Sequence, residues 1–410
     1  MAKTLPDKQS PATRLVTSGR TGAWPVVNPP VWRASTHLYE TMAALAEGPK
    51  HNADGRFYYG RRGSPTQWAL AEALTGLEPG AFGTMLYPSG VAAIAATFLT
   101  VLKPGDVLLM TDNAYDPSRA LGRGLLKEYG IETRLFAPTD LAAFEAAICE
   151  RTRAVFLEAP GSLTLEMQDV PAMAAIARAR GIVSIFDNTW ASPLGFQAHA
   201  AGIDISVMSL TKHVGGHSDA MMGSASAGEE WYGKLRRRAQ ALGQVVSPDD
   251  AALMLRGLRT LGIRLEQETS SALHISQWLA SRDEVAAVLN PVVPGAPGHA
   301  LWARDFTGGC GLFSFILKND PKNGDGAAAR ARFVDALTLF GIGYSFGGFE
   351  SLVVPVDPAP IRTVSAWPPA GIDPAHTFGL RLSIGLEDPA DLIADLERGF
   401  AAMRPEIQGE

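Results

Sequence analysis

The sequence is poor in cysteine and in long apolar runs, and each shortage excludes a class of protein. Its two cysteines, Cys149 and Cys310, are too few for a disulfide framework and lack metal-ligand spacing. The longest apolar run, Val91 to Leu102, is too short to cross a bilayer and contains two threonines. We therefore expect no disulfide, no metal site and no membrane partner.

Positive charge is also scarce. The net charge is −6 and no long basic block occurs, so nucleic acid is not favoured as a partner. The short run Arg236-Arg237-Arg238 is interpreted as the solvated face of a helix. Met1 to Arg20 has no apolar core segment and does not resemble a secretory signal. The expected location is a reducing compartment, most simply the cytoplasm.

What the chain does have is a regular alternation of helical and strand patterns between about residues 60 and 258, at the spacing of βαβ units. Apolar strands such as Val107 to Met110 and Val183 to Phe186 indicate a mostly parallel sheet covered on both faces. We predict an α/β fold with a large doubly wound domain, 61–258, and a smaller α/β C-terminal domain, 259–410. A long helical pattern, Leu253 to Trp278, could bridge them. Residues 1–60 read as an arm that packs on a neighbouring subunit.

Lys212 stands just after a predicted buried strand, Ile203 to Met208, and a glycine pair, Gly215-Gly216, follows it. Lysine is costly to bury unless its charge is lowered or used. A lysine enclosed by a strand and small residues is placed as a Schiff-base lysine would be. Taken alone, Lys212 could equally be a surface lysine on a loop.

Asp187 ends the apolar strand 182–186, and the interval to Lys212 has room for one connection and one further strand. Both side chains are therefore expected at the carboxyl edge of one sheet. A carboxylate there needs a cationic partner, such as a protonated pyridine nitrogen, although Asp187 alone could simply cap the following turn. A carboxylate for a pyridinium and a lysine for an imine are what pyridoxal phosphate (PLP) requires. Ser209 and Thr211 could add hydroxyls to its phosphate.

Two other segments are candidates for phosphate binding. The backbone N–H groups of Gly90 and Val91, at the start of a predicted helix, would face an anion. An ordinary N-cap at Ser89 is the simpler interpretation of that segment alone. Tyr59 and Arg61, between glycines in the arm, offer a phenol and a guanidinium, with a solvated basic turn as the alternative.

Two further residues have a candidate role in binding flat or anionic groups. Tyr115 follows the strand Val107 to Met110, so its ring could stack on a planar cofactor. A packed core tyrosine is the alternative. Arg381 lies among the apolar residues of a predicted strand, 378–384, without an obvious acidic neighbour. Such an arginine needs an anion, and a substrate carboxylate would fit.

Six segments, in order along nearly the whole chain, resemble the Cys/Met-metabolism family of PLP enzymes and are most similar to its bacterial cystathionine β-lyases. They are Phe57 to Gly63, Glu158 to Ser162, Asp187 to Trp190, Thr211 to Asp219, Ser345 to Leu352 and Arg381 to Asp388. The resemblance implies the fold of type I PLP enzymes. It also implies a homotetramer, a dimer of dimers whose active sites are shared between subunits.

The resemblance implies a role for each candidate. Lys212 would hold PLP as an imine and then act as acid and base, Asp187 would pair with the pyridine nitrogen, and Tyr115 would stack on the ring. Arg381 would bind the substrate α-carboxylate, with Ser345 and Phe346 nearby. The implied phosphate ligands are Gly90, Val91, Ser209 and Thr211, together with Tyr59 and Arg61 of the adjacent subunit. Tyr59 is also expected beside the substrate, in a catalytic role with Lys212 and Tyr115.

The implied reaction is β-elimination on a sulfur amino acid. L-cystathionine would give homocysteine, pyruvate and ammonia, a step of methionine synthesis. The segment Ser162-Leu163 matches β-lyases, because γ-acting relatives usually carry Asn-Pro there. Phe346 and Gln240 depart from the tryptophan and tyrosine of well-known members near the substrate, which leaves the preferred sulfur amino acid open. A γ-acting relative is the alternative enzyme.

A regulator or binding scaffold built on the same fold is a second alternative. Loss of the lysine, of the aspartate or of the carboxylate-binding arginine would indicate it, and Lys212, Asp187 and Arg381 are all present.

Overall fold

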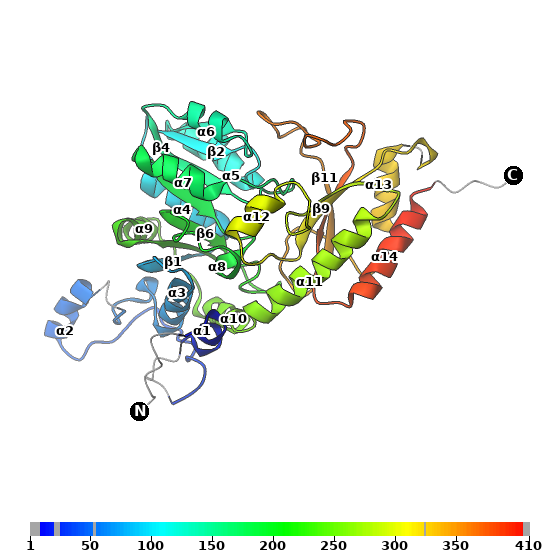
Figure 1. The fold of residues 1–410 in the computed structure, drawn as a ribbon. Helices are drawn as coiled ribbons and strands as arrows, with labels where there is room; N and C mark the ends of the chain where they lie inside the picture. The colour runs from blue at the N-terminus through cyan, green and yellow to red at the C-terminus, as the bar shows by residue number, and fades with distance from the viewer. Residues whose placement is uncertain (1–8, 20–24, 52–54, 324, 405–410) are drawn as a thin grey trace.

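The computed structural model describes residues 9–19, 25–51, 55–323 and 325–404. Two sheets, each packed against helices, make up most of the molecule, and the long helix α11 (Leu261–Ala280) runs between them (Figure 1). Parts of the predicted arm, residues 1–8, 20–24 and 52–54, lie outside the described residues.

The larger sheet has seven strands in the order β1-β7-β6-β5-β4-β2-β3. Its strands are β1 Gly83–Tyr87, β2 Val107–Thr111, β3 Glu132–Phe136, β4 Thr152–Glu158, β5 Val183–Asp187, β6 Ile205–Ser209 and β7 Gly223–Ala227. The pairs from β3 through β6 are parallel, and β7 runs antiparallel to both β6 and β1. The predicted mostly parallel sheet is confirmed.

Both faces of this sheet are covered. Successive strand residues point to opposite faces, so Val155 and Phe186 belong to one core while Phe156 and Ile185 belong to the other. The first core is completed by α3 Pro65–Leu77, α6 Leu141–Ala147, α7 Val170–Ala179 and α10 Pro248–Leu258. The second is completed by α4 Gly90–Val101 and α9 Glu229–Ala241, the latter carrying the three consecutive arginines. This is the doubly wound arrangement that the sequence predicts.

The smaller sheet has five strands in the order β10-β11-β12-β9-β8. They are β8 Val285–Leu289, β9 Leu312–Leu317, β10 Gly341–Ile342, β11 Leu352–Val356 and β12 Gly379–Ser383. All pairs are antiparallel except β10 with β11. The other helices after α11 are α12 His299–Asp305, α13 Gly326–Asp335 and α14 Pro389–Ala402. We propose to keep the domain boundary at 258/259, since α10 ends at Leu258.

One expected helix differs from the structure. The pattern Leu253 to Trp278 spans two helices, because α10 and α11 are separated at Arg259 and Thr260. The helix α13 ends at Asp335, and the backbone N–H groups of 338–340 beyond it donate to the Asp395 carboxylate.

The arm contributes short helices and exposed apolar side chains. Its helices are α1 Pro11–Thr17 and α2 Met42–Glu47, followed by 3-10 turns at Gly48–His51 and Gly60–Arg62. Leu38 is 95% exposed and Met42 is 79% exposed.

None of the helices in the described ranges is long and apolar enough to span a membrane. Those ranges also contain no cluster of three or more His, Cys, Asp or Glu side chains suited to a metal ion.

Candidate active site

The carboxyl ends of β2, β4, β5 and β6 open into a cavity of about 500 Å³. Side chains from the smaller sheet close its other side. All the predicted site residues line it except Tyr59 and Arg61. They are Gly90, Val91, Tyr115, Asp187, Ser209, Thr211, Lys212, Ser345, Phe346 and Arg381. The structure therefore brings these ten residues, which are far apart along the chain, into one cavity, and their roles stay predictions.

Lys212 is held against the smaller domain. Its Nζ donates a hydrogen bond to Ser345 Oγ at 2.7 Å and lies 5.1 Å from the centre of the Phe346 ring. Ser345 has a φ of 114°, a strained value for a residue other than glycine that is typical of functional sites. Burial, together with the positive charge of Arg381, lowers the pKa of Lys212 to about 8, while Asp187 opposes this shift. A useful fraction of the amine is therefore neutral near pH 7.

Asp187 and Glu158 end neighbouring parallel strands and lie opposite each other in register. The Asp187 carboxylate accepts hydrogen bonds from Thr189 N at 3.0 Å and Thr189 Oγ1 at 2.5 Å. Burial raises the pKa of Asp187, while Thr189 and the Lys212 charge oppose the rise. Burial and the Asp187 charge raise the pKa of Glu158 well above its ordinary value. The Lys212 charge thus opposes the rise at Asp187, whereas backbone N–H groups alone oppose it at Glu158.

Glu158 is a site residue to which the sequence analysis assigned no role. Its Oε2 accepts the backbone N–H of Tyr115 at 2.7 Å, so it helps to place the tyrosine. The signal that identified Asp187, a carboxylate at the end of an apolar strand, applies equally to Glu158.

The first turn of α4 forms a cradle for an anion. Ser89 caps the helix by accepting Ala92 N at 3.1 Å, which leaves the N–H groups of Gly90 and Val91 directed beyond the helix. A Cβ on Gly90 would lie 2.8 Å from Ser209 Cβ, so the close approach of these two segments requires glycine. The N-cap and the phosphate interpretations of this segment are therefore compatible.

The two hydroxyl residues before the lysine are differently placed. Thr211 Oγ1 bonds the Met222 backbone twice, donating to its carbonyl at 3.2 Å and accepting its N–H at 3.0 Å. The Ser209 backbone N–H donates to Thr189 Oγ1 at 2.9 Å. The cradle, Lys212 and Asp187 together fit the phosphate, aldehyde and ring nitrogen of PLP.

Arg381 comes from β12 and lies on the opposite side of the cavity from the large sheet. Its Nη2 donates to the Ser345 carbonyl at 3.1 Å. Burial lowers the pKa of Arg381, yet a guanidinium stays charged at pH 7. Within the described part of the chain, Arg381 forms no ion pair with a carboxylate. A substrate carboxylate is the partner that its burial calls for.

Three residues expected near the substrate or the cofactor lie outside this cavity, namely Tyr59, Arg61 and Gln240. Arg61 and Gln240 line a separate cavity of about 550 Å³, where Arg61 Nη1 donates to the Gln240 carbonyl at 3.3 Å. Tyr59 is 44% exposed. A single chain therefore does not bring these residues to Lys212. Their expected place beside the cofactor and substrate depends on a second subunit.

Comparison with known proteins agrees with this geometry. The chain is 46% identical to a putative cystathionine β-lyase of Rhizobium johnstonii, with 92% of this chain and 91% of the relative covered. It is 42% identical to the cystathionine β-lyase MetC of Escherichia coli, with 95% and 98% covered. A crystal structure of cystathionine γ-synthase from Xanthomonas oryzae in complex with cystathionine matches with a TM-score of 0.86 and 33% identity, covering 97% of this chain and 99% of that one. The family model of the Cys/Met metabolism PLP-dependent enzymes matches residues 12–401, and the chain belongs to that family.

Proposed function

We propose that the protein is a PLP-dependent carbon–sulfur β-lyase. L-cystathionine and water would give homocysteine, pyruvate and ammonia, a step that supplies methionine synthesis. The observation that carries the proposal is one cavity holding a buried lysine of lowered pKa, a buried aspartate and a buried arginine. The names of the Rhizobium and Escherichia relatives support the β-lyase assignment.

PLP, when bound, supplies the sink for the electron pair left at the substrate Cα. Gly90 and Val91 would hold its phosphate, Asp187 its ring nitrogen and Tyr115 its ring face. Lys212 would hold its aldehyde carbon. Each of these residues lines the cavity.

The chain's own residues then orient the substrate and move one proton. Arg381 binds the α-carboxylate, which fixes the Cα–H bond relative to Lys212. The neutral Lys212 amine accepts the Cα proton, and the resulting ammonium donates a proton to the sulfur that leaves Cβ. The hydrogen bond to Ser345 keeps the nitrogen in place between these two transfers.

A γ-acting enzyme is the second candidate, and the structural likeness to the Xanthomonas γ-synthase supports it. The two candidates share the cofactor contacts and differ in the bond that breaks. The keto acid released from L-cystathionine distinguishes them. Pyruvate supports the β-lyase, whereas 2-oxobutyrate contradicts it and favours the γ-acting enzyme.

The lowered pKa of Lys212 predicts how cofactor uptake depends on pH. Only the neutral amine attacks the PLP aldehyde, so the rate of uptake by the apoprotein should rise about tenfold from pH 7 to pH 9 and level off above about pH 9. An ordinary lysine would rise about a hundredfold over that range without levelling. Visible absorbance measures the uptake of PLP. The reaction of PLP with Nα-acetyl-lysine, whose ε-amine is free, is measured under the same conditions and corrects for the titration of PLP itself. A rise that continues to pH 10 would contradict the lowered pKa.

We further propose a homotetramer of paired dimers, in which Tyr59 and Arg61 complete the site of the adjacent subunit. The exposure of Tyr59, the separate position of Arg61 and the exposed apolar side chains of the arm support it. Tyr344 at the cavity mouth is 90% exposed, as expected of a residue that a second subunit covers. The cytoplasmic location stays a prediction.

Mixed subunits test the shared site. Lys212→Ala and Arg61→Ala chains, each nearly inactive alone, should regain up to about a quarter of wild-type activity when unfolded and refolded together, because a mixed dimer contains one intact site. Refolding either variant by itself is the control. Failure of the mixture to regain activity would argue that each site is built from one chain.

A further inference from the structure

Beside the substrate cavity lies a buried group of two acids and two bases, here called the four-charge cluster. Its members are Asp112, Arg119, Glu166 and Arg362, with side-chain exposures of 0%, 2%, 15% and 3%. Buried charges persist only when they are paired and hydrogen-bonded. The first three come from the large domain, and Arg362 comes from the connection between β11 and β12 in the small domain. The cluster therefore ties the two domains together.

Asp112, directly after β2, anchors that connection. Its carboxylate accepts the backbone N–H groups of Thr363 at 3.2 Å, Val364 at 3.1 Å and Ser365 at 3.0 Å, as well as the Thr363 hydroxyl at 3.1 Å. Arg119 lies 3.2 Å from Asp112 and also donates to the Ile361 carbonyl. These contacts fix residues 361–365 to the large domain.

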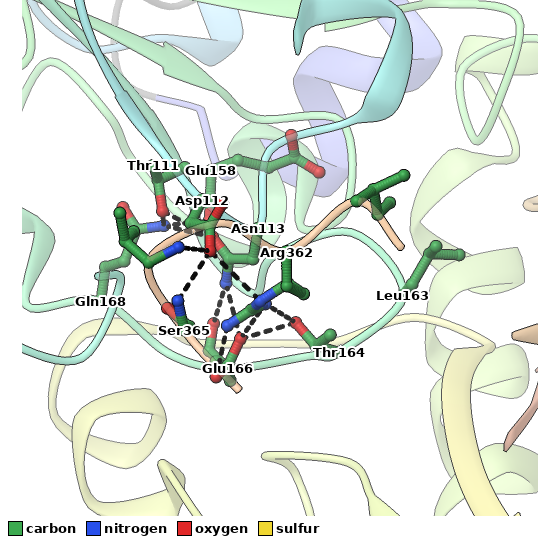
Figure 2. Close-up of polar contacts among 12 residues, drawn as sticks. Thr111, Asp112, Asn113, Glu158, Leu163, Thr164, Glu166, Gln168, Arg362 and Ser365 are labelled. Carbon is green, nitrogen blue, oxygen red and sulfur yellow. Dashed lines mark hydrogen bonds and ion pairs between the residues drawn. The ribbon is translucent and has the colours of Figure 1, made fainter. Parts of the chain in front are cut away.

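Arg362 provides the second anchor (Figure 2). Its Nη1 donates to Glu166 Oε2 at 2.8 Å and its Nη2 to Glu166 Oε1 at 3.1 Å, which is a bidentate pair. Nη1 also reaches Thr164 Oγ1 at 3.3 Å, and Nε lies 3.4 Å from Asp112 Oδ2. Arg362 thus joins the segment after β2 to the segment after β4.

The cluster is continuous with the backbone that carries Tyr115. Only Asn113 and Ala114 separate Asp112 from Tyr115, and Arg119 lies in the helix that Tyr115 caps, α5 (Asp116–Leu121). Asn113 Nδ2 contacts the Glu166 carbonyl at 3.4 Å, a contact that Figure 2 also shows. A change in Arg362 would therefore reach Tyr115 through Asp112.

The anchored connection also forms part of the cavity wall, through Pro358, Ile361 and Arg362. With the substrate carboxylate at Arg381 and its amino group beside Lys212, this wall and Leu163 are among the lining residues that remain for the group attached to sulfur. The cluster therefore determines where that group meets the protein.

We propose that Arg362 is a positioning residue that, through Asp112 and Glu166, fixes residues 358–365 as the wall facing the sulfur substituent and fixes Tyr115 in the site. The part concerning the substituent rests on the proposed β-lyase function. The part concerning Tyr115 does not.

The test compares Arg362→Met with Arg304→Met in the holoenzyme. Arg304, which is half exposed, is the control, because it also joins the two domains through a bidentate pair, with Asp169 at 2.7 and 3.1 Å, and it does not line the cavity. Three quantities are measured: hydrogen–deuterium exchange, the visible circular dichroism of bound PLP, and the kcat and KM for L-cystathionine and for the short substrate S-methyl-L-cysteine. Arg362→Lys, which keeps the charge without the bidentate geometry, replaces Arg362→Met if the latter does not fold.

Arg362→Met should increase exchange in residues 112–121 and 358–377 and alter the circular dichroism. It should raise the KM for L-cystathionine about tenfold, with a smaller rise for S-methyl-L-cysteine. Arg304→Met should do none of these. Unchanged circular dichroism and unchanged exchange at residues 112–121 would overturn the proposal that Arg362 fixes Tyr115. This test holds even if no substrate is cleaved. Equal KM changes for the two substrates would overturn the role of the wall.

Discussion

Lys212→Ala should lower kcat for L-cystathionine by about 10³-fold or more. A positioned acid–base group alone contributes about 10² to 10⁴ to a rate, and we propose that this lysine also holds the cofactor. The protein should keep its fold, because alanine only enlarges a cavity that is already open. The measurement is steady-state pyruvate release, together with the visible absorbance of the protein after incubation with PLP.

Lys234→Ala is the matched control, since Lys234 lies on α9, pairs with Glu230 and does not line the cavity. Its substitution should leave both readouts unchanged. Near wild-type turnover in Lys212→Ala would show that another group removes the proton and that the site has been assigned to the wrong residue.

Asp187→Asn should lower kcat/KM by about 10² to 10³. Removing the charge of one partner in a buried pair costs about 2–5 kcal/mol, and the pyridine nitrogen would no longer be held protonated. Asparagine keeps the shape and can still accept the Thr189 hydrogen bonds. The affinity for PLP and the visible spectrum of the bound cofactor should therefore change together with the rate.

The control for Asp187→Asn is Asp204→Asn. Asp204 has similar contacts, since its carboxylate accepts the Ser184 N–H and hydroxyl at 2.8 Å each, but it does not line the cavity. Loss of stability without loss of kcat/KM is the outcome expected there. If Asp187→Asn behaved in the same way, Asp187 would be a structural residue rather than a cofactor ligand.

The central site could be predicted because its signals are local. Lys212 and Asp187 each follow an apolar strand, and strands of a parallel sheet end at one edge, so two short segments were enough to place both residues in one cavity. Tyr59 and Arg61 illustrate the limit of this reasoning. Their role depends on a partner subunit, and one chain places them in a different cavity.

The remaining features depend on contacts between distant segments. Asp112 and Arg362 carry no periodic pattern that would pair them, and the long connection after β11 gave no signal. The break between α10 and α11 was missed for a similar reason. A Cβ on Gly257 would lie 2.2 Å from the Val214 and Gly215 carbonyls, so α10 packs directly on the segment after Lys212. Arg264 then donates to the Gly257 and His213 carbonyls, which fixes the turn into α11.

The most direct test of the account is to identify both products that the purified, PLP-loaded protein forms from L-cystathionine. Quantitative proton NMR counts the keto acid and the thiol in one sample, with Lys212→Ala as the blank. We expect equimolar pyruvate and homocysteine, which requires cleavage of the Cβ–S bond at the site around Lys212. Equimolar 2-oxobutyrate and cysteine would contradict the β-lyase while leaving the cofactor contacts intact. If neither pair of products formed, L-cystathionine would not be the substrate.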